Sequence, residues 1–185
     1  MKVNETKLPE VLIFEPDVFD DERGYFFETY QSDRYKKAGL DVTFVQDNLS
    51  YSKHGVLRGL HYQHPSAQGK LVTVLSGEVF DVAVDVRRGS PRFGTWVGVI
   101  LSAENHRQVW IPEGFAHGFC VTGDSALFSY KCTELYNPET EQCIRWNDDS
   151  IGIDWPINEP IVSNKDMAGL PLAKMPADLL PGIDE

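Results

Sequence analysis

The segment Gly55–His64, GVLRGLHYQH, places several polar side chains in a stretch whose apolar residues predict a β-strand. Its two most reactive groups are Arg58 and His61. An imidazole titrates near neutral pH and can act as a base, whereas a guanidinium can form paired hydrogen bonds with a phosphate. Residues three apart on a regular strand point to opposite faces. A bulge or twist at Gly59 is therefore needed if both are to point inward.

The histidine spacing bears on whether the chain could bind a metal. PEGFAHGF, residues 112–119, resembles the second motif of the cupin superfamily, Pro-x-Gly-x-x-His, whose histidine is here His117. Metal-binding cupins add a first motif, His-x-His followed by a glutamate. This chain instead has His61-x-x-His64, whose side chains should point apart, and it has Gln68 near the glutamate position. A catalytic metal needs about three protein ligands, so we expect no metal.

His61 and His117 could instead be hydrogen-bonded histidines of a core. Lys70 and Asp81 are predicted to face the same interior, where buried charges cost free energy unless they are paired or used. We therefore expect a polar ligand pocket, with Asp81 paired to Lys70 or His117. The other histidines are expected to be structural or solvated: His54, His64 and His106.

Composition narrows the class of partner. The formal net charge of −11 argues against nucleic acid or an anionic membrane, because both need a basic surface, but it leaves room for a small anionic ligand in a locally basic pocket. No apolar run approaches the roughly 20 residues of a membrane helix, and the polar start MKVNETKLPE lacks a signal-peptide core. We expect a cytoplasmic protein. Three cysteines fit free thiols in a reducing compartment: Cys120, Cys132 and Cys143.

Alternation at period two predicts many short strands. In residues 78–86, one face of such a strand carries Val79, Asp81, Ala83 and Asp85, and the other carries Phe80, Val82, Val84 and Val86. With frequent turn signals, this pattern predicts a mainly β sandwich or barrel in a single domain over residues 1–185. A short helix is expected at Ser32–Ala38, with Ser32 as N-cap and Gly39 as its stop. The segment 147–185 should lie at the periphery as loops and short helical turns.

Six segments, in order, carry a resemblance to a known family: FFETYQ, FVQDNLSYS, GVLRGLHYQ, QGKLVTVLSGEVFDVAVDVRRGSPRFG, IPEGFAHGF and YKCTELYNPETEQCIRWND. Over roughly residues 14–170 the chain resembles the dTDP-4-dehydrorhamnose 3,5-epimerases. The resemblance implies a cupin-like double-sheet β-barrel, or jelly roll, that uses neither metal nor cofactor. It also implies a homodimer with shared active sites, to which an arm at about residues 1–31 contributes, and dTDP-4-dehydro-6-deoxy-D-glucose as the substrate.

The resemblance also implies residue roles. His61 is the base, Asp166 orients it, Lys70 stabilises the enolate oxygen, and Tyr130 is the acid on the opposite face of the sugar. Such a set suits epimerisation beside a ketone, which needs a base, an oxyanion partner and an acid. The resemblance places substrate contacts at Arg23, Phe26, Glu28, Gln46, Asp47, Asn48, Arg58, Asp81, His117, Tyr136, Glu141 and Lys165, with Arg23, Phe26 and Glu28 reaching the partner subunit's site.

Three other functions remain open at this point. A single-position epimerase of the same family would share the base, the lysine and much of the pocket, although Tyr130 beside His61 and Asp166 favours reaction at both carbons. A non-catalytic nucleotide-sugar-binding cupin would be expected to lose His61, Lys70 or Tyr130, and this chain keeps all three. A metal-dependent cupin isomerase or oxygenase is opposed by the broken first motif.

Overall fold

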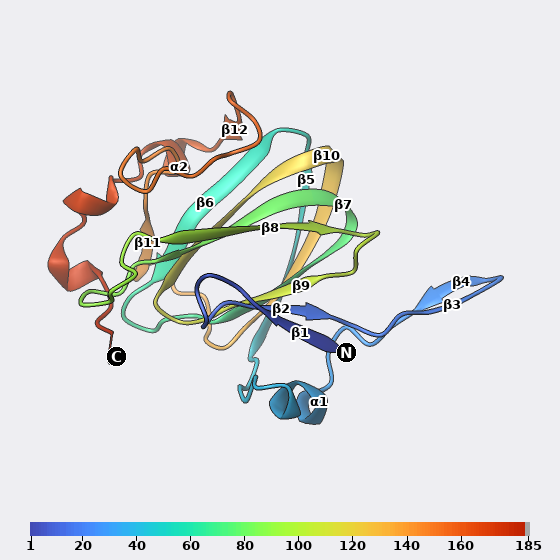
Figure 1. Cartoon of the computed structure of the whole chain (residues 1–185). Coiled ribbons are helices and arrows are strands. Elements are labelled where there is room, and N and C mark those ends of the chain that lie inside the picture. Colours follow the sequence, from blue (N-terminus) through green and yellow to red (C-terminus); the bar gives the residue numbers. More distant parts are fainter. Residues whose placement is uncertain (184–185) are drawn as a thin grey trace.

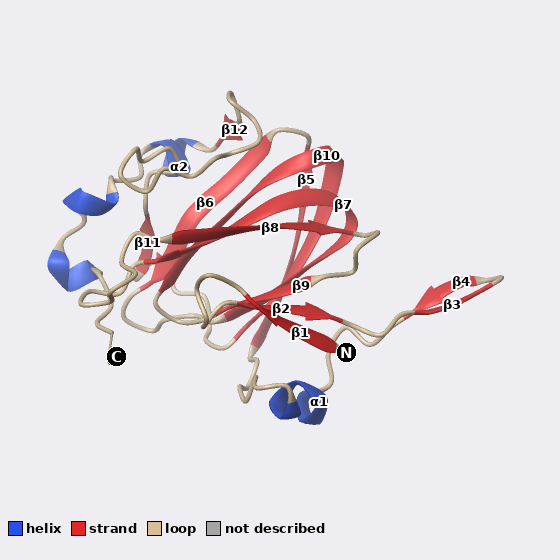
Figure 2. Ribbon diagram, in the orientation of Figure 1, coloured by secondary structure: helices blue, strands red, loops and turns tan. Residues whose placement is uncertain are grey.

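The computed structural model describes residues 1–183, which form a mainly β fold with short helices at its edge (Figure 2). The strands are β1 (Lys2–Glu5), β2 (Leu12–Glu15), β3 (Phe19–Asp21), β4 (Gly24–Phe26), β5 (Gln46–Lys53), β6 (Val56–Gln63), β7 (Lys70–Asp85), β8 (Trp96–Ser102), β9 (Gln108–Ile111), β10 (Phe115–Cys132), β11 (Glu141–Cys143) and β12 (Ile161–Val162). The helices are α1 (Ser32–Lys37) and α2 (Asn164–Met167), and the 3₁₀ turns are η1 (Leu172–Lys174) and η2 (Ala177–Leu179).

Two long antiparallel strands, β7 and β10, connect the two layers of the fold (Figure 1). The first half of β7 pairs with β9 and its second half pairs with β8. Likewise, the first half of β10 pairs with β6 and its second half pairs with β5. One layer thus contains β8, β7, β10, β6 and β11, and the other contains β1, β2, β9, β7, β10 and β5. This arrangement is the predicted cupin-like double-sheet jelly roll.

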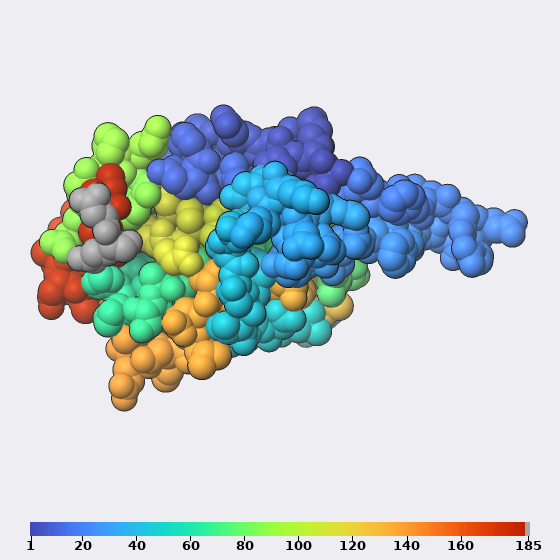
Figure 3. All heavy atoms as spheres, turned by 90° about the horizontal axis from the view of Figure 1, so that it is seen from below, coloured from blue at the N-terminus to red at the C-terminus, as the bar shows by residue number. Residues whose placement is uncertain are grey.

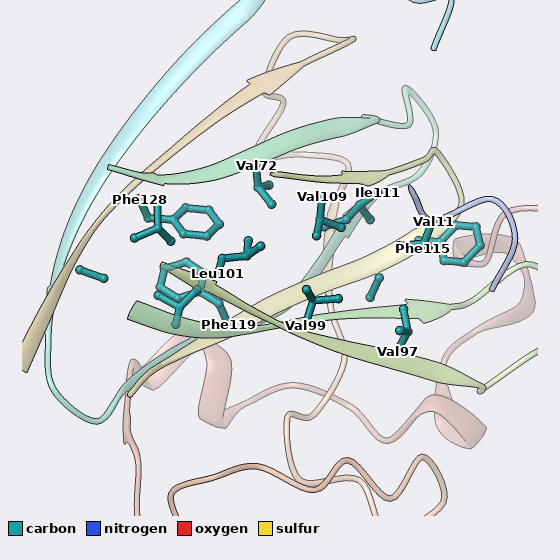
Figure 4. Close-up of a cluster of buried hydrophobic side chains, with 14 of the residues drawn as sticks. Val11, Val72, Val97, Val99, Leu101, Val109, Ile111, Phe115, Phe119 and Phe128 are labelled. Carbon is teal, nitrogen blue, oxygen red and sulfur yellow. The ribbon is translucent and has the colours of Figure 1, made fainter. Parts of the chain in front are cut away.

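Both faces of β7 are buried, in agreement with the alternation predicted for residues 78–86. Its inner face joins a large apolar cluster drawn in Figure 4, to which β7 contributes Val72, Val74, Val79 and Ala83. Its outer face forms a second cluster with the C-terminal segment, made of residues that include Val82, Val84, Val86, Ile151, Leu172, Met175 and Leu180. The C-terminal segment therefore shields the outer face of this layer from water.

The predicted helix is present, but its N-cap lies one residue earlier than expected. Gln31 has extended backbone angles, and its side chain accepts a hydrogen bond from the Arg34 N–H at 2.6 Å. Ser32 is therefore the first helical residue, and its prediction as the cap was wrong. Gly39 follows the helix with a φ of +99°, which agrees with its predicted role as the stop. No helix among residues 1–183 is long and apolar enough to cross a membrane.

The N-terminal segment divides into two parts. β1 and β2 belong to the main sheet, whereas β3 and β4 form a separate two-stranded hairpin. This hairpin projects from the body of the molecule (Figures 1 and 3). Its side chains include the exposed rings of Phe19, Tyr25 and Phe26. The projecting part of the 1–31 segment is thus the hairpin and its flanking residues.

A bulge interrupts β6 beside Gly59. His117 lies opposite His61, and Phe119 lies opposite Arg58. The two residues on β6 are three positions apart and their partners on β10 are two apart, so β6 contains one extra residue. Gly59 has a φ of +126°, which side-chain-bearing residues rarely adopt. A Cβ at this position would lie 2.5 Å from Gly118 Cα. The bulge required by the sequence argument is therefore present.

Alanine substitutions at Gly59 and Gly24 together distinguish the effect of a steric clash from that of backbone strain. We expect Gly59→Ala to lower the free energy of unfolding by about 2–4 kcal/mol, because it adds overpacking to an unfavourable φ. Gly24→Ala is the matched control, since Gly24 has a φ of +125° but nothing within 4 Å of the added Cβ. It should cost about 1–2 kcal/mol or less. Urea unfolding measures both, and equal losses would contradict the predicted clash.

Candidate active site

Two cavities meet at three of the predicted catalytic residues. One, of about 280 Å³, is lined by Gln46, Asn48, His61, Tyr62, Gln63, Gln68, Lys70, Tyr130, Tyr136 and Glu141. The other, of about 520 Å³, is lined by Ser50, Val56, Leu57, Arg58, His61, Lys70, His117, Phe119, Phe128, Tyr130, Ile161, Val162, Ser163, Lys165 and Asp166. Their shared residues are His61, Lys70 and Tyr130. A ligand that extends through both cavities must pass these three groups.

His61 on β6 forms a hydrogen-bonded dyad with Asp166 on α2. The distance from His61 Nε2 to Asp166 Oδ1 is 2.6 Å, and Asp166 is almost fully buried. The Gly59 N–H also donates to Asp166 at 3.4 Å. Burial favours the protonated carboxyl, but the hydrogen bonds and charge of His61 and the Gly59 N–H outweigh it and hold the pKa of Asp166 below its usual value. An ionised carboxylate can orient the ring and stabilise an imidazolium.

Ser163 explains how so short a helix places Asp166. Its side-chain oxygen accepts a hydrogen bond from the Asp166 N–H at 3.1 Å, which caps α2 at its first turn. β12, directly before this cap, pairs in parallel with the start of β6. Asp166, which follows His61 by 105 positions in the sequence, is thereby held against it.

Lys70 begins β7 and lies half-buried between the two cavities. Its ammonium forms no side-chain hydrogen bond or ion pair with any other residue of 1–183. Burial lowers its pKa, while the negative potential of Cys132, Glu141 and Asp81 acts in the opposite direction. A half-buried ammonium that is not paired with a protein group is well suited to receive an anionic oxygen.

Tyr130 lies on β10 and lines both cavities. Burial is the main cause that raises the pKa of its phenol above 10. Its hydroxyl therefore remains protonated at neutral pH and is available as a proton donor. Its neighbour on the same strand face is Phe128, whose ring centroid lies 6.0 Å away.

His117 and Asp81 form a second, more deeply buried dyad. His117 Nε2 lies 2.8 Å from Asp81 Oδ2, so Asp81 pairs with His117 rather than with Lys70. His117 faces His61 across the β6–β10 ladder and lines the larger cavity. Each histidine thus has its own carboxylate, and both rings are positioned by hydrogen bonds.

The residues at the open end of the smaller cavity form a connected polar group. The Tyr136 hydroxyl donates to Glu141 Oε2 at 2.7 Å, and Lys165 donates to the same oxygen. Gln46 Oε1 accepts a hydrogen bond from the Tyr136 N–H at 2.9 Å. The Tyr136 ring is 50% exposed, which leaves it free to stack against a flat ligand. Asn48 lies on the same face of β5 as Gln46.

The structure does not bring every predicted contact into the cavities. Asp47 points to the other face of β5, where it pairs with Lys131 at 3.0 Å. Arg58 does line the larger cavity, and its Nε donates to Ser52 Oγ at 3.1 Å. The three residues of the arm also lie outside both cavities: Arg23 pairs with Asp21, Glu28 pairs with Arg34, and Phe26 is 66% exposed.

Sequence reasoning missed Ser50 and Cys143. Ser50 lines the larger cavity, and its buried Oγ has no hydrogen-bond partner among residues 1–183. The period-two spacing from Gln46 and Asn48 predicts that it shares their face. Cys143 lies opposite His61 in the β6–β11 ladder, with its Sγ 3.9 Å from Asp166 Oδ1. Burial, aided by Asp166, raises the pKa of this thiol to about 12. No signal in the sequence shows that contact.

Comparison with known proteins decides the family. The family model of dTDP-4-dehydrorhamnose 3,5-epimerase matches residues 5–174. The chain is 56% identical over 183 residues to a dTDP-4-dehydrorhamnose 3,5-epimerase of Pseudomonas aeruginosa, covering 98% of this chain and 100% of that protein. The chain belongs to the dTDP-4-dehydrorhamnose 3,5-epimerase family. Members of this family are isomerases, and this chain is an enzyme of that class.

Two further proteins with epimerase names are similar to this chain. The Neisseria gonorrhoeae protein of that name is 59% identical over 170 residues, covering 91% of this chain, and this chain spans about half of it (52%). The crystal structure of a dTDP-6-deoxy-D-glucose-3,5-epimerase from Legionella pneumophila in complex with dTDP-4-keto-L-rhamnose matches with a TM-score of 0.96 and 54% identity. That match covers 98% of this chain and 97% of the other.

The unpaired ammonium of Lys70 should lower the free energy of unfolding of this protein. We expect Lys70→Met to raise the free energy of unfolding by about 1–2 kcal/mol, because it removes a buried charge without a partner. The pKa of Lys70 is lowered by folding, so the unfolded chain binds this proton more tightly. The gain in unfolding free energy of Lys70→Met over the wild type is therefore largest at a pH below the pKa of Lys70 in the folded protein. It shrinks as the pH rises toward about 10.4, the ordinary pKa of lysine.

Urea unfolding across this pH range tests the Lys70 prediction. Lys53→Met is the control, because Lys53 is exposed at the end of β5, and it should change stability little at any pH. A Lys70→Met protein that is less stable than the wild type at every pH would show that the ammonium has a stabilising partner.

Proposed function

We propose that this chain converts dTDP-4-dehydro-6-deoxy-D-glucose to dTDP-4-dehydro-L-rhamnose, in the synthesis of dTDP-L-rhamnose. The observation that carries the proposal is the meeting of the His61–Asp166 dyad, Lys70 and Tyr130 where the two cavities join. The reaction inverts C3 and C5, the two carbons on either side of the C4 ketone. Both inversions need the same three chemical functions, so one site can perform them in turn.

The dyad supplies the base. His61 removes the proton from C3 or C5, and the electron pair moves onto the C4 oxygen to give an enolate. Asp166 is ionised and accepts a hydrogen bond from the ring, so it stabilises the imidazolium that forms. Lys70 stabilises the negative charge that develops on the C4 oxygen. This stabilisation is greatest in the transition state, where the charge is forming.

Tyr130 returns the proton. Inversion requires that the new C–H bond form on the face opposite His61, so the acid must be a different group from the base. The Tyr130 hydroxyl is protonated at neutral pH because burial raises its pKa. Delivery of its proton to the enolate restores the ketone, and exchange with solvent can then reset both residues for the second carbon.

The nucleotide is assigned to the charged and aromatic groups around this centre. Tyr136 offers an exposed ring for stacking on thymine, and Arg58 and Lys165 provide cations for the diphosphate. Gln46, Asn48, Glu141 and His117 line the same cavities and are proposed as further contacts. Asp81 would act through His117, to which it is hydrogen-bonded. No metal or cofactor has a role in this proposal.

We further propose that residues 1–185 act as one cupin-like unit that functions as a homodimer. Arg23, Phe26 and Glu28 lie outside the cavities of their own chain, so the proposed roles of the arm require a partner's site. Asp47 on β5 also lies outside both cavities. The projecting hairpin is rich in exposed aromatic rings. The outward face of β5 also carries exposed apolar side chains beside Asp47. Val45 just before the strand and Leu49 and Tyr51 on it are 51%, 61% and 61% exposed. Exposed apolar surface of this kind favours association. The free thiols fit a cytoplasmic location.

Deuterium incorporation tests the catalytic proposal. With dTDP-4-dehydro-6-deoxy-D-glucose in heavy water, NMR should show label at both C3 and C5 in the wild type. His61→Asn should slow exchange at both carbons by about 10²–10⁴-fold, because no base remains. Tyr130→Phe should retain more exchange than net inversion. Label and inversion at one carbon would instead identify a single-position epimerase, and no label would favour a binding protein.

The hairpin predicts the oligomeric state. We expect Phe26→Asp to shift the protein from dimer to monomer and to lower kcat/KM at least tenfold, because a charge disrupts the proposed apolar contact and withdraws the arm. Phe93→Asp, at an exposed ring outside the hairpin, should remain dimeric. Light scattering with parallel exchange assays measures both effects. A wild-type monomer with full activity would overturn the shared-site proposal.

A further inference from the structure

The catalytic dyad has a third potential metal ligand beside it. The ligand atoms of His61, Cys143 and Asp166 all lie within 4.8 Å of one another. They come from β6, β11 and α2, three segments held together by strand pairing and by the cap on α2. Cys143 Sγ lies 3.9 Å from the same Asp166 oxygen that contacts His61 Nε2 at 2.6 Å.

We propose that His61, Cys143 and Asp166 form an inhibitory site for a thiophilic divalent cation, of which Zn²⁺ is the representative. The site is distinct from the metal site of cupins, because it uses neither His117 nor a first-motif glutamate. The inhibitory effect rests on the proposed function, whereas the binding site itself does not.

The donor set selects the class of ion. Imidazole, thiolate and carboxylate are the ligands that Zn²⁺ accepts, and three protein ligands with one open position are typical of accessible zinc sites. Hard cations such as Mg²⁺ and Ca²⁺ prefer six or more oxygen ligands, and this cluster offers a single carboxylate. A thiol ligand also favours Zn²⁺ over harder first-row ions.

Movements of up to about 1.2 Å bring the three atoms into range, the largest for the pair His61 and Cys143, whose ligand atoms lie within 4.8 Å of each other. Zinc bonds of about 2.0–2.3 Å place tetrahedral ligands roughly 3.3–3.6 Å apart. The contact between Cys143 and Asp166 is slightly longer than this and must shorten by a few tenths of an ångström. The contact between His61 and Asp166 must open by somewhat less than 1 Å. Because His61 lines both cavities, the fourth coordination position can be reached by water or solute.

Binding of the ion removes the base by a defined exchange of protons. The Cys143 thiol loses its proton to solvent and becomes a thiolate. When His61 binds the ion through Nε2, its ring proton lies on Nδ1, so neither nitrogen keeps a free lone pair. Asp166 exchanges its hydrogen bond from His61 for a bond to the ion. The thiolate and the carboxylate together balance the charge of the divalent cation.

Metal titration tests the site directly. We expect Zn²⁺ to inhibit deuterium exchange by the wild type, EDTA to restore activity, and the inhibition constant to rise about tenfold or more in Cys143→Ala. Cys120→Ala is the matched control, because Cys120 is a buried thiol on β10 that is not part of the cluster of His61, Cys143 and Asp166. It should remain as sensitive to Zn²⁺ as the wild type. Equal inhibition of the wild type and Cys143→Ala would overturn the proposal.

A second measurement is independent of catalysis. Co²⁺ added to the wild type should produce a thiolate-to-cobalt charge-transfer band, and Cys143→Ser should lack it. Alkylation followed by mass spectrometry should also show that Zn²⁺ protects Cys143 in the intact wild type, which avoids any variant that fails to fold. The absence of a charge-transfer band, or alkylation of Cys143 at the same rate with and without Zn²⁺, would exclude this site. If the cobalt band forms but the metal-free, EDTA-treated wild type shows no exchange at either carbon, the proposed function fails while the metal site stands.

Discussion

The pairing of β7 with β10 is the interaction on which the site depends. Its register runs from the Phe115–Asp85 pair to the Cys132–Lys70 pair and crosses both layers of the barrel. Lys70 and Tyr130 lie near one end of this ladder, and Asp81 and His117 lie toward the other. Because the side-chain period of a strand is two, a slip of one residue in either strand would turn the two site residues of that strand away from the interior. The apolar clusters on both faces of the ladder hold this register, so core packing also fixes the geometry of the site.

The larger cavity is locally cationic on a strongly acidic chain. Arg58, Lys70 and Lys165 line the larger cavity, although the formal net charge is −11. Of these, Lys165 is neutralised by Glu141, whereas Lys70 has no ion-pair partner among residues 1–183. Arg58 also forms no ion pair among the described residues, and its Nε donates to Ser52 Oγ. Lys70 is the cation that lies beside the proposed enolate oxygen. A group that destabilises the free protein can thereby contribute free energy when negative charge forms next to it.

The fold was predictable from sequence to the extent that its signals are local. Alternation in residues 78–86 gave the two faces of β7 correctly, and the need for a bulge followed from the spacing of Arg58 and His61. The N-cap of α1 was misplaced because capping depends on backbone angles, and Gln31 is an unusual cap. Contacts between distant residues have no local signal. Asp166 was assigned to His61 by resemblance alone, and the approach of Cys143 depends on the pairing of β11 with β6. The orientation of Asp47 could have been found, because it alternates with Gln46 and Asn48.

The two histidine–aspartate dyads differ chiefly in access, and this difference bears on which histidine is proposed as the base. In both, a ring Nε2 contacts a buried carboxylate, at 2.6 Å for His61 and 2.8 Å for His117. The His61 side chain is 25% exposed and lines both cavities, whereas that of His117 is 9% exposed and lines only the larger one. A base must reach the carbon-bound proton and then exchange its own proton with solvent. Such exchange is slow for a ring enclosed by the core. The geometry thus favours His61 as the base, independently of any family resemblance. It favours His117 as a hydrogen-bonded side chain that lines the larger cavity without exchanging protons.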